Sequence, residues 1–284
     1  AYGGSFTTPG TATSCWQTIS AGYTHSVGIK TDGTLWAWGD NGYGQLGDGT
    51  TISKNTPTQI GSANNWESVS ASGGFTIAIK ANGTLWAWGN NAFGQLGDGT
   101  TTNRTTPTQI GTATNWNSVT VGEGFALAVK DNGTLWSWGY NNYGQLGDGT
   151  TANRTVPTQV GTATNWQSTA AGAGFSLAIR TNGTLWAWGY NNSGQLGDGT
   201  TTNRITPLQI GTENDWANVA AGYAHSVGLK TNGILYTWGN NANGQLGDST
   251  TTNKLTPTGV YDQVESIETG WYYTVGTTTF GNML

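Results

Sequence analysis

The sequence predicts an all-β protein, a six-bladed β-propeller of 50-residue repeats with four strands in each blade. Three observations predict this fold. The string Gly-Gln-Leu-Gly-Asp recurs at 44–48, 94–98, 144–148, 194–198 and 244–248, a constant spacing of 50 residues. Each copy holds short alternating apolar runs and an Asn-Gly or similar turn, and no stretch has helical periodicity. The two chain ends carry partial copies that together make one more repeat.

One copy, residues 66–115, predicts the strands of a blade in order. Trp66–Ala71 alternates as a first strand, and Phe75–Lys80 forms a second. The dipeptide at 82–83 is Asn-Gly, which favours a two-residue hairpin turn into a third strand, Thr84–Trp88. An irregular loop follows, and Thr106–Ile110 completes the blade as an outer strand, where its proline is tolerated.

The chain ends predict a closed ring. Val264–Gly276 restarts the repeat and stops before the Trp-Ala-Trp-Gly strand, whereas Ala1–Gly4 resembles the end of that strand and Thr7–Pro9 resembles its later Thr-Thr-Pro. Strands from both termini would then complete one blade and remove the exposed edges of an open stack. We expect one domain, 1–284, with blades at about 16–65, 66–115, 116–165, 166–215, 216–263, and 264–284 plus 1–15.

Composition excludes several classes of function. Only 9% of residues are charged and the net charge is −5, whereas phosphate binding needs a basic surface. No apolar run approaches the ~20 residues of a membrane span. We therefore expect neither nucleic-acid binding nor membrane insertion. Cys15 is the single cysteine, which rules out an intramolecular disulfide and a thiolate metal site.

Two features bear on location. The scarcity of cysteine fits a bacterial exported protein, although it fits a cytosolic one equally well. The chain begins at Ala1 without Met, as it would after removal of a signal peptide or as part of a larger parent. We expect a secreted or cell-surface bacterial protein.

The repeated strings resemble the regulator-of-chromosome-condensation propeller family over nearly the whole chain. The resemblance rests on segments such as Ala21–Ser26, Asn82–Gly89 and Asn91–Gly97. It implies four-stranded blades around a central channel, usually seven, so that six is a departure. The founding member's nucleotide-exchange wedge and basic tail have no counterpart here, and that activity is not expected. The chain is more similar to the secreted bacterial branch, which includes propellers that inhibit β-lactamases through aromatic rim loops.

The polar residues that recur at equivalent positions of the repeats do not predict an enzyme or a bound cofactor. His25 and His225 occupy a position that holds Phe or Tyr in the other copies, which indicates packing. The aspartate of each Gly-Gln-Leu-Gly-Asp string lies six residues before a Lys or Arg, as Asp98 does before Arg104. The alternating carboxylates of a calcium loop are absent, so we expect ion pairs rather than a metal site. The recurring tryptophans suit packing between adjacent sheets better than a sugar-stacking surface.

Positions where the copies differ predict the working surface. They fall in two kinds of loop, one after the first strand and one before Gly-Gln-Leu-Gly, and many hold aromatic residues of the types that anchor interfaces. Neutral drift at unconstrained sites is the alternative. The candidate partner-binding residues are Tyr23, Tyr43, Phe93, Tyr140, Tyr143, Tyr190, Tyr223, Trp271 and Tyr272.

These loops favour a non-catalytic module that binds a protein partner. A structural subunit of a fibre, adhesin or larger surface complex, formed by self-assembly, is the main alternative. Carbohydrate binding is disfavoured, because it predicts the same site in every blade. We expect no metal and no cofactor.

Overall fold

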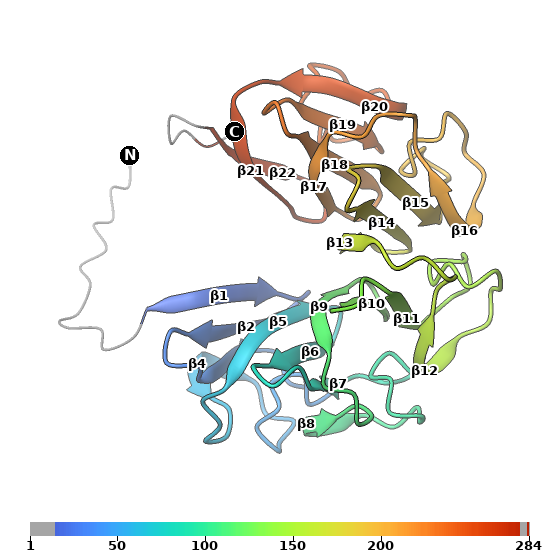
Figure 1. Ribbon diagram of the computed structural model, residues 1–284. Coiled ribbons are helices and arrows are strands. Elements are labelled where there is room, and N and C mark those ends of the chain that lie inside the picture. The colour runs from blue at the N-terminus through green and yellow to red at the C-terminus, as the bar shows by residue number, and fades with distance from the viewer. Residues whose placement is uncertain (1–14, 279–282, 284) are drawn as a thin grey trace, which may run out of the picture.

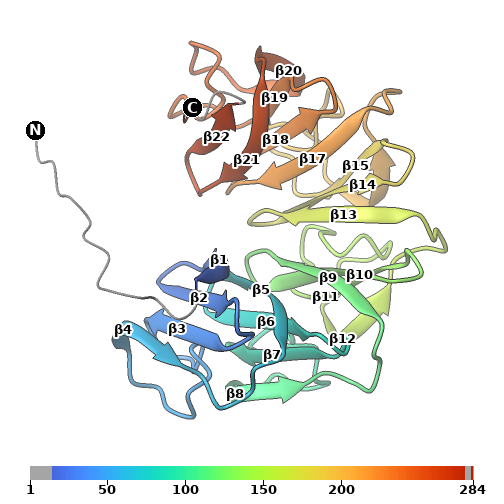
Figure 2. The same cartoon turned by 60° about the vertical axis from the view of Figure 1, so that its left-hand side comes forward.

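The computed structural model describes residues 15–278 and 283, and all statements on structure concern these residues. Every regular element among them is a β-strand, and the strands form five four-stranded antiparallel sheets and a sixth sheet of two strands. The sheets follow one another in chain order around a centre, as Figures 1 and 2 show. The described part of the chain holds no helix long and apolar enough to cross a membrane.

The strands repeat at the period of the sequence. The first sheet contains β1 (Trp16–Ala21), β2 (His25–Lys30), β3 (Leu35–Gly39) and β4 (Lys54–Gln59). The second contains β5 (Trp66–Ser72), β6 (Phe75–Lys80), β7 (Leu85–Gly89) and β8 (Arg104–Gln109). The third contains β9 (Trp116–Val121), β10 (Phe125–Lys130), β11 (Leu135–Gly139) and β12 (Arg154–Gln159).

The remaining sheets continue the series. The fourth contains β13 (Trp166–Ala171), β14 (Phe175–Arg180), β15 (Leu185–Gly189) and β16 (Arg204–Gln209). The fifth contains β17 (Trp216–Ala221), β18 (His225–Lys230), β19 (Leu235–Gly239) and β20 (Lys254–Tyr261). The sixth contains β21 (Val264–Thr269) and β22 (Thr274–Thr278). Repeated four-stranded sheets without helices make a β-propeller, and the predicted fold class is confirmed to that extent.

The first strand of each sheet is the innermost. Strands β1, β5, β9, β13, β17 and β21 pack against one another in this order. Residues at their ends, Ala21, Ala71, Val121, Ala171, Ala221 and Thr269, line one shared central channel. Small residues near the end of each innermost strand, such as Thr169 and Ala171, line the channel, whereas Trp166 at the start of the same strand packs in the core between sheets.

The core consists of tryptophan and aliphatic layers between neighbouring sheets. Trp88 is fully buried, and its indole N–H donates to the carbonyl of Gln45 in the previous repeat at 2.9 Å. Leu46, beside that carbonyl, is also fully buried. Trp138, Trp188 and Trp238 make the equivalent bond at 2.8–2.9 Å. The Gly-Gln-Leu-Gly string is therefore repeated because each loop is built into the next sheet, and the predicted packing role of the tryptophans is confirmed.

The hairpin turns are tied to the next sheet as well. Gly83 has φ of +71°, which favours glycine, and a Cβ there would overlap the carbonyl of Thr114. The carbonyl of Gly83 accepts a hydrogen bond from the Trp116 amide at 3.1 Å. The predicted turn at 82–83 is present, and it doubles as a contact between blades.

Among the described residues, no sheet covers one face of the first sheet. Trp16 is 39% exposed, whereas its counterparts Trp66 and Trp216 are 5% and 3% exposed. Ile19 is 54% exposed, whereas Val69 is 9% exposed. This is the face that, in later sheets, packs against the preceding blade. Of the N-terminal residues predicted to complete that blade, 1–15, all but Cys15 lie outside the described residues.

Candidate partner-binding rim

Two kinds of loop lie at one end of the propeller, which we call the aromatic rim. In the first blade these are the β1–β2 turn and the β3–β4 loop. Pairing of Ala21 with Ser26 and of His25 with Gly39 brings both loops to the same end of the sheet. All nine predicted binding residues lie in loops of these two kinds. The opposite end, the far rim, carries the hairpin turn between the second and third strands of each four-stranded blade, which in the first blade is the β2–β3 turn.

An asparagine holds in shape each loop between the third and fourth strands of a blade. Asn191 is fully buried, and its side-chain oxygen accepts from the Leu196 amide at 2.9 Å. Its side-chain nitrogen donates to Asp198 Oδ1 and to the carbonyls of Thr200 and Thr202, at 3.1 Å each. Asn41, Asn91, Asn141 and Asn241 make equivalent contacts. Since these contacts use no variable side chain, the loop keeps its shape in every blade.

Each loop aspartate pairs with the basic residue six positions later, as predicted. Asp98 lies 2.6 Å from Arg104, and Asp48 lies 3.2 Å from Lys54. Asp148, Asp198 and Asp248 form the same pair with Arg154, Arg204 and Lys254. Burial raises the pKa of Asp98, and hydrogen bonds from Thr100 and Arg104 outweigh it, so that the net shift is downward. The carboxylates stabilise loops, and no group of metal-ligating side chains occurs among the described residues.

Four aromatic side chains form a row that we call the aromatic ladder. The ring centroids of Phe93 and Tyr140 are 4.8 Å apart, those of Tyr140 and Tyr143 are 6.1 Å apart, and those of Tyr143 and Tyr190 are 4.7 Å apart. The ladder crosses three blades, because each loop aromatic packs over the following blade. Tyr43 lies similarly over Gly74, but its neighbour there is Asn90, so it stands apart from the ladder.

The other four predicted residues form a second group, the seam cluster. The ring centroids of Tyr23 and Trp271 are 3.6 Å apart, which joins the first sheet to the last one at this rim. Tyr223 lies 5.0 Å from Trp271 and 5.7 Å from Tyr272. The Tyr223 amide also donates to the Trp271 carbonyl at 3.1 Å. The seam cluster is thus held by backbone as well as ring contacts.

Glu123 lies between the two aromatic groups. The Tyr23 hydroxyl, from the first blade, lies near its carboxylate. Burial raises the pKa of Glu123, and the interaction with the Tyr23 hydroxyl opposes that shift. Burial, and then the charge of Glu123, raises the pKa of Tyr23 and of Tyr223. The amide of Glu123 donates to the carbonyl of Gly172 at 3.4 Å, which fixes the turn to the next blade.

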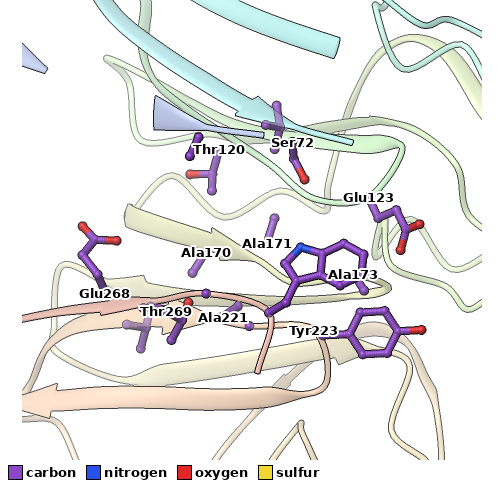
Figure 3. A pocket seen from close by; sticks show the side chains of 18 of the residues that line it. Ser72, Thr120, Glu123, Ala170, Ala171, Ala173, Ala221, Tyr223, Glu268 and Thr269 are labelled. Atoms are coloured by element: carbon purple, nitrogen blue, oxygen red, sulfur yellow. The ribbon is translucent and has the colours of Figure 1, made fainter. Parts of the chain in front are cut away.

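Two cavities meet at Glu123. The central channel, about 320 Å³, runs between the inner strands, with Glu123 and Tyr223 at one end and Glu268 toward the other (Figure 3). Its wall between these residues is formed mainly by small side chains such as Ala171 and Ala221. A second cavity of about 340 Å³ lies beside the aromatic ladder and also includes Glu123 and Tyr223. The rim is therefore hollowed around one carboxylate.

The two histidines are core residues. His25 and His225 are 3% and 0% exposed, and burial lowers the pKa of each to about 4. Their Nε2 atoms lie 3.0 Å from Thr76 Oγ1 and 3.3 Å from Thr274 Oγ1. Phe75, Phe125 and Phe175 fill the same position with at most 1% exposure. The exception is Tyr273, which is 60% exposed.

The nine predicted residues are therefore gathered at one rim, with Tyr43 set apart. Tyr23, Tyr43, Phe93, Tyr143, Tyr223 and Tyr272 are exposed, whereas Tyr140, Tyr190 and Trp271 are half-buried. Whether they bind a partner stays a prediction. The sequence-based set omits Glu123, although its column reads Tyr23, Gly73, Glu123, Ala173, Tyr223 and Trp271. Glu123 is the single acid at a repeat position whose residues all lie near the channel mouth. This is the signal that could have identified Glu123.

Comparison with known families accounts for the repeats. The model of the regulator of chromosome condensation (RCC1) repeat matches residues 32–79, 82–129, 132–179, 182–229 and 232–276, which together make up most of the chain. The chain belongs to the RCC1 repeat family. A second RCC1 repeat model matches residues 16–45, 66–95, 116–145, 166–195 and 216–245. The resemblance seen in the repeated strings is thereby confirmed.

Solved structures of RCC1-type propellers share the fold. Human WBSCR16 is 23% identical, with a TM-score of 0.84 over 94% of this chain and 72% of that one. Yeast RCC1 (Prp20), in its complex with Kap60, is 19% identical, with a TM-score of 0.60 over 92% of this chain and 79% of that one. A further structure, Prp20p from Saccharomyces cerevisiae, is 20% identical, with a TM-score of 0.59 over 92% and 82% of the two chains. At these identities the likeness shows the fold alone.

Proposed function

We propose that this RCC1-repeat propeller is a non-catalytic module that binds a protein partner through its aromatic rim. The observation that carries the proposal is the gathering of nine variable aromatic residues at one end of a fold whose core is repeated. Six of them are exposed, and eight of them lie in two groups of contacting rings. Exposed Tyr and Trp on rigid loops are the residues that most often anchor protein interfaces.

The partners of one structurally similar protein, yeast Prp20, support this reading. The solved complex of yeast RCC1 contains Kap60, and the report on Prp20p describes binding to Gsp1p and histones. Those partners belong to Prp20. For this chain we propose only the same mode of binding, in which the loops of a propeller contact another protein.

We also propose a secreted or cell-surface bacterial location, in the branch of the family that acts outside the cell. Its support is compositional: a polar, weakly charged chain with one cysteine. We further propose that the ring has six blades and that residues 1–15 complete the sixth, together with 264–284. The two-stranded sheet β21–β22 and the uncovered face at Trp16 and Ile19 support that closure.

Self-assembly into a larger surface structure is the second candidate. The outer strands and their loops expose apolar side chains, including Val156 at 50%, Ile205 at 43% and Leu255 at 38%. None of these three residues is among the nine predicted rim residues, although Ile205 lies against Gly144 and Leu255 against Gly194 in the neighbouring loops, so side-by-side association would use the outer strands and the edge of the rim. The two candidates therefore predict different residues at the interface.

A pull-down with rim variants tests the proposal. The purified chain is first sized in solution and then used as bait in the culture medium of its own organism. We expect a specific protein to be retained by the unaltered chain and by Tyr261→Ala, which removes a 45%-exposed tyrosine from outer strand β20. The same protein should not be retained by Tyr143→Ala or Tyr223→Ala. Truncation of a central anchor residue weakens the free energy of binding by about 2 kcal/mol or more.

The outcomes separate the candidates. A partner that is retained equally by both rim variants contradicts binding through the aromatic rim. A chain that is oligomeric in solution, and that becomes monomeric when Ile205 and Leu255 are changed to Ser, supports self-assembly instead.

A further inference from the structure

The cavity beside the aromatic ladder has an unusual lining. Its walls include the rings of Phe93, Tyr140, Tyr143, Tyr190 and Tyr223, and Glu123 supplies a carboxylate. The remaining lining residues are Ala173, Gly174 and Ala224, so the cavity holds no second acid and no base among the described residues. Its volume of about 340 Å³ is of the order of a small ligand pocket.

This lining suits a cation with an extended apolar stem. Aromatic faces attract a cation that lies over the ring, and the attraction grows when water is excluded. A carboxylate nearby gives charge-assisted hydrogen bonds, which are about twice as strong as neutral ones. The planar guanidinium of arginine meets both needs, since it stacks on rings and donates in a fixed fork to a carboxylate.

No basic side chain of this chain is available to fill the cavity. All ten Lys and Arg residues lie within 15–278, and each has another role. Lys54, Arg104, Arg154, Arg204 and Lys254 pair with the loop aspartates. Lys30, Lys80, Lys130, Arg180 and Lys230 lie over tryptophan or tyrosine rings at the far rim, at 3.7–5.6 Å from ring centroids.

The carboxylate is held in place before any ligand arrives. The amide of Glu123 donates to the carbonyl of Gly172 in the next blade at 3.4 Å, and the Tyr23 hydroxyl of the first blade lies near the carboxylate. The adjoining turns are linked in turn, since Ala173 donates to Tyr223 and Tyr223 donates to Trp271. A preorganised carboxylate loses little freedom on binding, which favours affinity.

We propose that this cavity receives an arginine side chain of the protein partner, stacked among the ladder rings and Tyr223 and paired with Glu123. The inference rests on the proposed function and specifies the partner's chemistry: a basic residue projecting from its surface. The net charge of −5 would also speed the approach of a basic patch.

Amide-resolved NMR titration of the full chain tests the site without knowledge of the partner. The probe is Nα-acetyl-L-arginine N-methylamide, and its neutral match is the citrulline analogue of the same shape. We expect saturable shifts of the Glu123, Ala173 and Tyr223 amides with the arginine probe, and about tenfold weaker binding of the citrulline probe.

Three variants make the test specific. Glu123→Gln keeps the shape of the side chain and should abolish the preference for arginine, whereas Glu67→Gln removes an exposed carboxylate of β5 and should leave it intact. Tyr143→Leu keeps Glu123 and should weaken the arginine probe by about tenfold. Each variant's amide spectrum shows whether it is folded.

Two results would overturn the inference. One is equal binding of the arginine and citrulline probes, and the other is an arginine preference that survives Glu123→Gln in a folded chain. Either result leaves the proposed function standing if a partner is still lost with Tyr223→Ala. If the partner binds Tyr223→Ala as well as it binds the unaltered chain, the proposed function is overturned instead.

Discussion

A single hydroxyl determines how each buried histidine is protonated. Thr76 Oγ1 donates to the carbonyl of Gln45 at 3.0 Å, so its oxygen accepts from Nε2–H of His25. Nδ1 of His25 is then unprotonated, and it is buried without a hydrogen-bond partner among the described residues. Thr274 sets the same arrangement for His225, because it donates to the carbonyl of Gln245 at 2.9 Å. A second proton on His25 would find no acceptor among the described residues, and burial lowers the pKa of both histidines.

The lowered pKa values predict an acid-sensitive fold. The folded pKa of each histidine is about 4, below the ordinary 6.5, so between these values the unfolded chain binds protons that the folded chain does not. Stability should therefore fall as pH drops from about 6.5 to about 4, by on the order of 3 kcal/mol for each histidine at the lower limit. Denaturant unfolding measured across this range checks the expected slope.

The sister repeats supply the matched variant for this test. His25→Phe combined with His225→Phe copies the residue found at 75, 125 and 175. We expect the double variant to lose most of the pH dependence between 6.5 and 4, while Thr76 keeps its bond to Gln45. An unchanged slope would show that other groups cause it.

At the scale of one element, the β15–β16 loop depends on its buried asparagine. Asn191→Ala removes the acceptor for the Leu196 amide and the donor to three oxygens. We expect a loss of about 2–3 kcal/mol, because buried partners are left unsatisfied. Amide hydrogen exchange should rise within 192–203. The neighbouring Asn192 is exposed, so Asn192→Ala should change stability by less than about 0.5 kcal/mol.

The elements of a blade could be predicted because each carries a local signal. Period-two alternation predicts the strands, the Asn-Gly dipeptide predicts the turn, and Pro107 marks the outer strand β8. The pairing of Asp98 with Arg104 could be predicted from spacing alone. The Asn191 network could not, because nothing in the spacing of a loop tells which polar side chain turns inward. The bond from Trp88 to Gln45 links two repeats and has no signal within either one.

The candidate site could be predicted only in part, for a related reason. Variation between copies marks which loop positions differ, and all nine aromatic residues found this way lie at one rim. Their division into a ladder and a seam cluster follows from how neighbouring blades meet, which a linear repeat does not reveal. Glu123 comes within reach of Tyr23 only because the inner turns converge across the channel mouth.

At the scale of the whole molecule, closure of the ring remains a prediction with a direct test. Deletion of residues 1–14 should lower Tm by roughly 5 °C or more if they complete the sixth blade. Amide exchange in β21 and β22 should rise at the same time. A chain in which residues 1–14 are replaced by Gly and Ser controls for length and should behave like the deletion. An unchanged Tm in both would contradict closure by the N-terminus.

The loop that carries Tyr43 has one more implication. The backbone amide there donates to Gln45 Oε1 at 2.9 Å, and Phe93, Tyr143, Ser193 and Asn243 make the same bond at 2.8–2.9 Å. Tyr, Phe, Ser and Asn thus sit on an identical main-chain support. A library randomised at these five positions should consequently yield folded members almost throughout, making the propeller a frame for selecting new binders whose specificity is chosen independently of stability.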